Sequence, residues 1–198
     1  MRTEVDSWYA STLTRGAEGL DRRAFTVDEI ERLTSAGILD RDEGFELIAG
    51  EIVPTSPELR RHAVMKRRLA SWFTRRVESP REVGSGVSVQ LATDALLQPD
   101  VVVLEGVGRG KFLSVGSALL VIEVADLTLH RDLGSKARDY AQAGLGELWV
   151  VDLEARVTHV RRDLSAAGYT ATPPVPFELP ITPRFDARLT LRIADLED

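Results

Sequence analysis

The sequence predicts a mixed α/β (α+β) fold, in which a mixed central β-sheet is flanked by helices. Two observations predict it. Continuous apolar, β-branched runs that suit buried strands alternate along the chain with amphipathic segments that suit helices. Hydrophobic residues also make up 43% of the 198 residues, which is enough for a substantial core.

Three segments are expected to be helical. The first begins at Thr26, because Thr26 and Glu29 stand at capping-box spacing. The second, residues 59–77, gathers its apolar side chains on one face at helical spacing. The third covers residues 132–143, with Asp132 as its expected N-cap.

The strands follow from apolar runs bounded by turn residues. Residues 45–53 read as two short strands around an Ala49-Gly50 turn. The continuous apolar runs suit buried central strands, and residues 147–154 and 156–163 suit the two strands of a hairpin. The further expected strands are residues 86–91, 96–104, 118–125, 147–154 and 156–163.

Composition narrows the class of protein. Residues 1–24 lack periodicity and are expected to form a loosely ordered N-terminal extension, followed by a single domain over residues 25–198. There are no cysteines, so disulfides and thiolate zinc sites are excluded. The acidic residues near the N-terminus do not fit a signal peptide, and no apolar run could span a bilayer. These features predict a cytoplasmic protein without a membrane partner.

Three acidic residues stand inside or beside apolar strands, where an ionised carboxylate needs a partner. Glu46 lies in "FELI", Asp100 opens "DVVVL", and Glu123 interrupts "LLVIEVA". Neighbouring strands lie about 4.8 Å apart, so carboxylates at matching heights can converge on one ion. An all-oxygen site of this kind suits Mg²⁺ or Mn²⁺.

The pattern alone leaves simpler interpretations open. Glu46 could pair with an arginine at a sheet edge, and Asp100 could be an ordinary turn residue after Pro99. Glu123 is harder to explain in this way, because both of its flanks are strongly apolar.

Longer stretches resemble the Uma-two-type family of putative restriction endonucleases, within the PD-(D/E)xK nuclease superfamily. The similar stretches are "LQPDVVVL", "LLVIEVAD" and "RDLGSKARDYAQAGLGELWVVDLE", together with "FTVDEIERLTSAGILD", "FELIAGEIVPTSP" and the nearby His62. The similarity runs from Phe25 to Asp163 and is weaker beyond. A Pro-Asp pair alone is a weak signal, whereas the ordered set is a strong one.

The resemblance implies a restriction-endonuclease-like core and a set of site residues. Asp100 and Glu123 would be paired metal ligands, the backbone carbonyl of Val124 would also face the metal, and Glu46 would be a further acidic member. The superfamily's lysine, two residues after the glutamate, is replaced here by Ala125.

The family pattern instead points to Lys136 in the following helix, where it would hold the attacking water or neutralise charge on the phosphate. The alternative for Lys136 is an i,i+4 pair with Asp132 on an exposed helix. Tyr140, one turn further on the same face, could line the site, and the preferred interpretation is an aromatic residue at the edge of the core.

The helix at residues 59–77 also carries a basic face. The simpler interpretation of this face is a solvated helix surface, and the functional interpretation is a surface that contacts phosphates. The arginines concerned are Arg60, Arg61, Arg67, Arg68 and Arg75.

The sequence therefore predicts a Mg²⁺- or Mn²⁺-dependent endonuclease that hydrolyses nucleic acid, with DNA as the expected partner. The net charge of −6 argues against indiscriminate nucleic-acid coating and leaves open a hydrolase of smaller phosphodiesters. A non-catalytic nucleic-acid- or protein-binding module on the same fold is the main alternative. A C2 homodimer would suit double-strand cutting.

Overall fold

The computed structural model describes residues 13–15, 21–40, 44–55, 57–106 and 111–197, which form two compact units. One unit comprises residues 1–57 and 90–98, and the other comprises residues 58–89 and 99–198. The mixed α+β class predicted from the sequence is confirmed. The prediction of a single domain over residues 25–198 stays a prediction.

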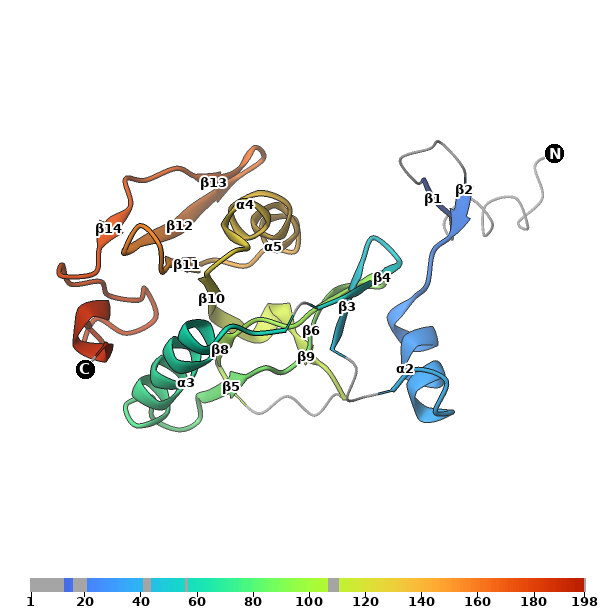
Figure 1. Cartoon of the computed structure of the whole chain (residues 1–198), viewed down its shortest axis with the longest axis horizontal. Coiled ribbons are helices and arrows are strands. Elements are labelled where there is room, and N and C mark those ends of the chain that lie inside the picture. Colours follow the sequence, from blue (N-terminus) through green and yellow to red (C-terminus); the bar gives the residue numbers. More distant parts are fainter. Residues whose placement is uncertain (1–12, 16–20, 41–43, 56, 107–110, 198) are drawn as a thin grey trace. The chain divides into compact units, whose positions relative to one another are not determined.

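The described part of the first unit is built from short antiparallel strands and the helix α2 (Figure 1). Its elements are β1 (Leu13–Arg15), β2 (Asp21–Arg23), α2 (Val27–Ser35), β3 (Phe45–Ile48), β4 (Glu51–Pro54), β7 (Ala95–Leu97) and most of β6 (Val89–Ala92). Strand β3 pairs with β4 on one side and with β7 on the other. In the predicted extension, β1 pairs with β2 in antiparallel fashion, and residues 1–12 and 16–20 lie outside the described residues.

Two local predictions in this unit are confirmed. Helix α2 begins after Thr26, whose hydroxyl accepts from the Glu29 backbone while the Glu29 carboxylate accepts from the Thr26 amide, a complete capping box. The β3–β4 turn has positive φ at both Ala49 and Gly50, which is the geometry that two-residue hairpin loops require.

The second unit contains the central sheet. In spatial order its strands are β13 (Gly168–Thr170), β12 (Val157–Ser165), β11 (Leu148–Asp152), β10 (Ala118–Ala125), β8 (Val101–Leu104) and β5 (Glu82–Ser85), and β14 (Val175–Pro176) also pairs with β12. Strand β10 runs parallel to β11 and antiparallel to β8, so the sheet is mixed. The expected hairpin of residues 147–163 is confirmed as β11–β12.

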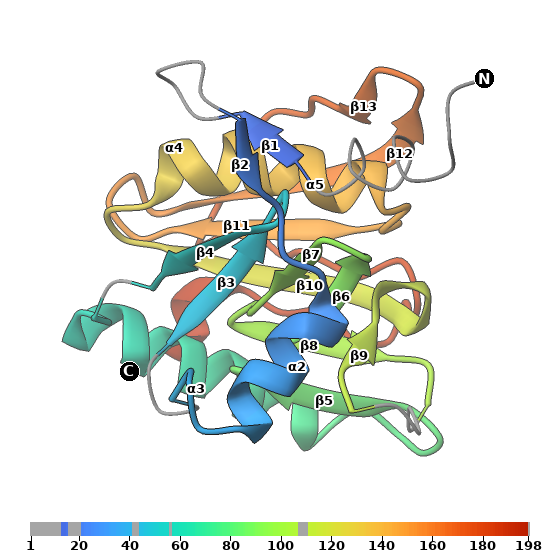
Figure 2. The same cartoon turned by 90° about the vertical axis from the view of Figure 1, so that its right-hand side faces the viewer.

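Helices lie on both sides of this sheet, as Figures 1 and 2 show for α3 (Arg60–Thr74) and α5 (Ala137–Gln142). Helix α3 buries Met65, Leu69 and Phe73 in the core against alternate residues of β8 and β10. Glu123 alternates with those β10 residues and therefore faces the side of α5, where Tyr140 is buried.

The helix expected over residues 132–143 begins earlier than predicted. It runs as α4 (Leu129–Arg131), a π-helical turn (Asp132–Lys136) and α5. Asp132 as N-cap is therefore wrong. It lies inside the helix, where its carboxylate accepts a hydrogen bond from the Thr128 hydroxyl.

The remaining elements of this unit are short: β9 (Leu113–Ser114) and two 3₁₀ turns, η1 (Val115–Ser117) and η3 (Ile193–Leu196). Among the described residues, no helix combines the length and the apolar character needed to cross a bilayer.

Candidate active site

Glu123 is a buried carboxylate in the middle of the sheet, with 3% of its surface exposed. Its Oε1 accepts a hydrogen bond from the Lys136 ammonium at 3.1 Å and another from the Tyr140 hydroxyl at 2.8 Å. An opposite charge and a hydroxyl donor at these distances offset the cost of burying the carboxylate. Among the described residues, Lys136 therefore supplies a cation that partners the buried Glu123 carboxylate.

The helix presents both partners to Glu123 from one face. Lys136 and Tyr140 are one turn apart, and the π-helical turn ends at Lys136. Lys136 is only 7% exposed, so the alternative of an exposed pair with Asp132 is wrong. Tyr140 is fully buried, so it lies within the core rather than at its edge, and its hydroxyl donates to Glu123.

Asp100 immediately precedes β8 and is a neighbour of Glu123 across the strand pair. The register Ile122↔Val101, extended by one residue, sets Asp100 opposite Glu123. The Asp100 Oδ2 accepts the backbone N–H of Val124 at 2.7 Å, which fixes its carboxylate beside β10.

A histidine and a lysine from α3 also reach Asp100. The His62 Nε2 lies 3.0 Å from Asp100 Oδ2, and the Lys66 Nζ lies 3.6 Å from Asp100 Oδ1. Burial acts to raise the pKa of Asp100, but the His62 hydrogen bond and charge, with the Val124 N–H, lower it overall. Burial acts to lower the pKa of His62, and the contact with Asp100 outweighs it and raises that pKa.

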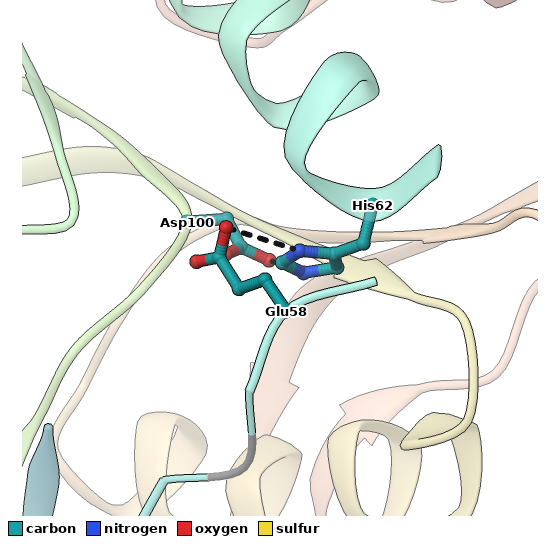
Figure 3. A group of neighbouring side chains, drawn as sticks. All are labelled: Glu58, His62 and Asp100. Carbon is teal, nitrogen blue, oxygen red and sulfur yellow. Dashed lines mark hydrogen bonds and ion pairs between the residues drawn. The ribbon is translucent and has the colours of Figure 1, made fainter. Parts of the chain in front are cut away.

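Glu58 completes a group that can hold a metal ion. The ligand atoms of Glu58, His62 and Asp100 all lie within 4.8 Å of one another, and Figure 3 shows their polar ends turned toward a common centre. His62 Nδ1 lies 3.7 Å from Glu58 Oε2, and Lys66 forms an ion pair with Glu58. Sequence reasoning did not single out Glu58 or Lys66. The four-residue spacing of Glu58, His62 and Lys66 is the signal that could have found them.

Asp132 adds a further buried acid close to this group. Burial raises the pKa of Asp132, and the charge of Asp100 acts in the same direction, while the Thr128 hydrogen bond and Lys136 oppose it. Asp100, Glu123, Lys136 and Asp132 therefore form one electrostatically coupled set within the second unit.

Glu46 lies on β3 of the first unit. It is buried, and its Oε1 accepts the backbone N–H of Gln98 at 3.1 Å. Its role as a further acidic member of the metal site stays a prediction.

The five arginines of the predicted basic face have different surroundings. Arg61 donates to Asp126 at 2.6 Å and to Glu154 at 3.2 Å, and Arg68 donates to the Leu196 carbonyl. Arg67 and Arg75 instead line a surface hollow of about 400 Å³ beside α3, together with Lys66 and Ser85. The Arg75 guanidinium also donates to the Ser71 hydroxyl, and Arg60 is exposed at the start of the helix.

The fold is similar to that of a solved protein. A crystal structure of a putative nuclease belonging to DUF820 from Anabaena variabilis matches with a TM-score of 0.65 and 17% sequence identity, over 87% of this chain and 97% of that one. At this identity the likeness shows the fold, which is the restriction-endonuclease-like core expected from the sequence. A comparison with curated proteins gives no match.

The family is shown by the sequence itself. The profile of the Uma2 family, described as putative restriction endonucleases, matches residues 27–193, which includes Asp100, Glu123 and the helix that carries Lys136. The expected family is confirmed: this chain belongs to the Uma2 family of putative restriction endonucleases.

Proposed function

We propose that this protein is a metal-dependent endonuclease that hydrolyses phosphodiester bonds in nucleic acid, with DNA as its substrate. One observation carries the proposal: two buried carboxylates, Asp100 and Glu123, are neighbours across the paired strands β8 and β10, and a buried lysine contacts the second. Buried charges cost stability, so a set of this kind supports a function that requires it. Membership of a nuclease-like family supports the same function.

The donor atoms suit a hard divalent cation. Asp100 and Glu123 supply carboxylate oxygens, and the carbonyl of Val124 is proposed as a third oxygen, since the Val124 amide already bonds Asp100. Oxygen ligands favour Mg²⁺ or Mn²⁺. Such an ion, when bound, polarises a phosphoryl oxygen and lowers the pKa of a bound water.

The protein's own side chains would position the attacking water and neutralise the charge that develops on the phosphate. The Lys136 ammonium, held at Glu123, would hold the attacking water or compensate the charge that develops on the phosphate. The Tyr140 hydroxyl fixes the orientation of Glu123, so it is a positioning residue. Glu46 is retained as a further acidic residue of the proposed site.

Arg67 and Arg75 are the arginines whose surroundings best suit phosphate contacts. Both line the hollow beside α3, which also includes Lys66, a neighbour of Asp100. Arg60, Arg61 and Arg68 complete the proposed basic face. We expect smaller contributions from Arg61 and Arg68, because their guanidinium groups are bonded within the protein.

A cleavage assay tests the proposal. Supercoiled plasmid, linear DNA and RNA are incubated with the purified protein in Mg²⁺, Mn²⁺ or EDTA, and the expected result is metal-dependent cleavage of DNA. Glu123→Gln should abolish it. Asp152→Asn is the matched control, because Asp152 is also a buried acid in the sheet but accepts hydrogen bonds from the turn at residues 154 and 155.

The alternatives give different results in the same assay. A linear product from circular DNA would support paired cutting by a homodimer, whereas nicking alone would support single-strand cutting. Binding of nucleic acid without cleavage under any metal would contradict the enzyme and favour a binding module. Cleavage of a small phosphodiester alone would contradict the nucleic-acid substrate.

A further inference from the structure

We propose that His62 is a ligand of the divalent ion held by Asp100, that Glu58 orients its ring, and that the site therefore favours transition ions such as Mn²⁺ and Co²⁺ over Mg²⁺. This inference rests on the metal site of the proposed function and defines its ligand set and metal preference. It concerns residues of the second unit alone.

The positions of the imidazole nitrogens carry the assignment. His62 lies between two carboxylates, with Nε2 3.0 Å from Asp100 and Nδ1 3.7 Å from Glu58. The Nδ1 atom is buried and makes no hydrogen bond with any described residue. A buried imidazole nitrogen without a hydrogen bond is unusual, because such groups are normally satisfied. A small approach of Glu58 would satisfy it.

One arrangement uses both nitrogens. Nε2, which faces Asp100, would bind the ion beside the carboxylate, and Nδ1–H would donate to Glu58 (Figure 3). A ligating histidine almost always donates its other N–H to such a partner, which fixes its tautomer and its orientation. Ligand atoms already within 4.8 Å of one another need little movement to meet at one ion.

An imidazole ligand changes the metal preference of the site. Oxygen ligands alone suit Mg²⁺, whereas imidazole nitrogen suits transition ions, whose affinities rise from Mn²⁺ toward Co²⁺ and Ni²⁺. A mixed set of Asp100 and His62 should therefore bind Mn²⁺ more tightly than Mg²⁺.

Lys66 supports the same location for a cation. Its ammonium forms ion pairs with both Glu58 and Asp100, so a positive charge is already stabilised among these side chains. The ammonium and a divalent ion would compete for the same carboxylates. Removing the lysine charge should therefore strengthen metal binding.

Metal binding, measured without substrate, tests the inference. Calorimetry gives the affinities for Mn²⁺ and Mg²⁺, and pulsed EPR of the Mn²⁺-loaded protein detects the hyperfine coupling of a ligating nitrogen. His62→Ala should remove the coupling and weaken Mn²⁺ binding by about tenfold or more, with a smaller effect on Mg²⁺. Glu58→Gln should weaken Mn²⁺ binding by about 10–100-fold, as for loss of an orienting partner. Lys66→Met should strengthen it.

His159→Ala is the matched control. Its Nε2 is likewise buried without a hydrogen bond and lies 3.7 Å from Asp152, and its side chain is about as buried as that of His62, but within the described residues it belongs to no group of three possible metal ligands. The control should leave both affinity and coupling unchanged. His62→Gln repeats the test with a larger side chain if the alanine variant unfolds.

Three outcomes would overturn the inference: nitrogen coupling that persists in both His62 variants, Mn²⁺ affinity that is unaffected by them, or absence of Mn²⁺ binding in the parent. Its failure differs from failure of the nuclease proposal. Nitrogen-coupled Mn²⁺ without DNA cleavage would support His62 as a metal ligand and contradict the nuclease proposal. DNA cleavage that does not depend on His62 would support the nuclease proposal and contradict His62 as a metal ligand.

Discussion

Replacing Lys136 by methionine should show how much the Lys136–Glu123 ion pair contributes to the stability of the fold. Both side chains are buried, and their charged atoms are 3.1 Å apart. Removing one partner of a buried ion pair costs about 3–5 kcal/mol, because the other charge is left without compensation. The Tyr140 hydroxyl still bonds Glu123, so we expect a loss near the lower end, about 3 kcal/mol. For a chain of this size that corresponds to a melting temperature lower by roughly 6–12 °C.

A second variant separates the uncompensated charge from the lost packing. Adding Glu123→Gln to Lys136→Met removes the buried charge and leaves an amide oxygen for Tyr140, so the double variant should be more stable than the single one. Urea denaturation of the metal-free proteins measures both differences. Arg138→Met is the control, because Arg138 is exposed on the same helix and should change stability by less than about 0.5 kcal/mol.

Turnover provides the functional half of this experiment. If Lys136 stabilises charge in the transition state, its loss should lower the cleavage rate by about 10²-fold at temperatures where the variant is folded, while metal binding is retained. Parental stability in Lys136→Met, or a double variant less stable than the single one, would refute the reasoning about the buried pair. A parental cleavage rate would refute the catalytic role.

Three further predictions concern the metal, the phosphate contacts and the buried acids. Asp100→Ala should abolish Mn²⁺ binding in calorimetry, and unchanged binding would remove Asp100 from the site. Arg67→Ala combined with Arg75→Ala should flatten the logarithmic salt dependence of nucleic-acid affinity by about two units, whereas an unchanged slope would make these arginines ordinary surface residues. Burial raises the pKa of Asp132 above its ordinary value of 3.8, so its contribution to stability is present below that pH and is lost as the pH rises through the folded-state pKa. Asp132→Asn should therefore unfold at higher urea than the parent at pH 7, with an advantage that shrinks toward pH 4; an equal advantage at both pH values would contradict this.

Periodicity located the central strands and their acidic residues, but it joined β7 and β8 into one expected strand over residues 96–104, and it did not find β5, β13 or β14. The runs at residues 101–104, 118–125 and 148–152 are apolar apart from Glu123 and the final Asp152, and all three are strands of the central sheet. Glu123 stood out because a carboxylate inside such a run needs a partner. These inferences use only the local sequence pattern, so they do not require knowledge of the tertiary contacts.

The partners of the acidic residues could not be read in the same way. Lys136 lies 13 residues after Glu123 and reaches it only because the chain folds back from β10 into a helix that begins at residue 129. Asp132 resembles an N-cap in sequence, but the preceding Thr128 already begins the helix, so Asp132 becomes an interior group. His62 meets Asp100 across 38 residues, a distance at which spacing carries no information.

The π-helical turn makes the number of residues between β10 and Lys136 more important than their identity. A Cβ added at Gly134 would meet nothing within 4 Å, so this position tolerates a side chain. Deleting the same residue would convert the π turn into a regular α turn and would change the spacing that brings the Lys136 ammonium to Glu123. Among relatives, insertions and deletions in this segment should therefore be rarer than substitutions, and a homologue one residue shorter here should carry its cation at another position.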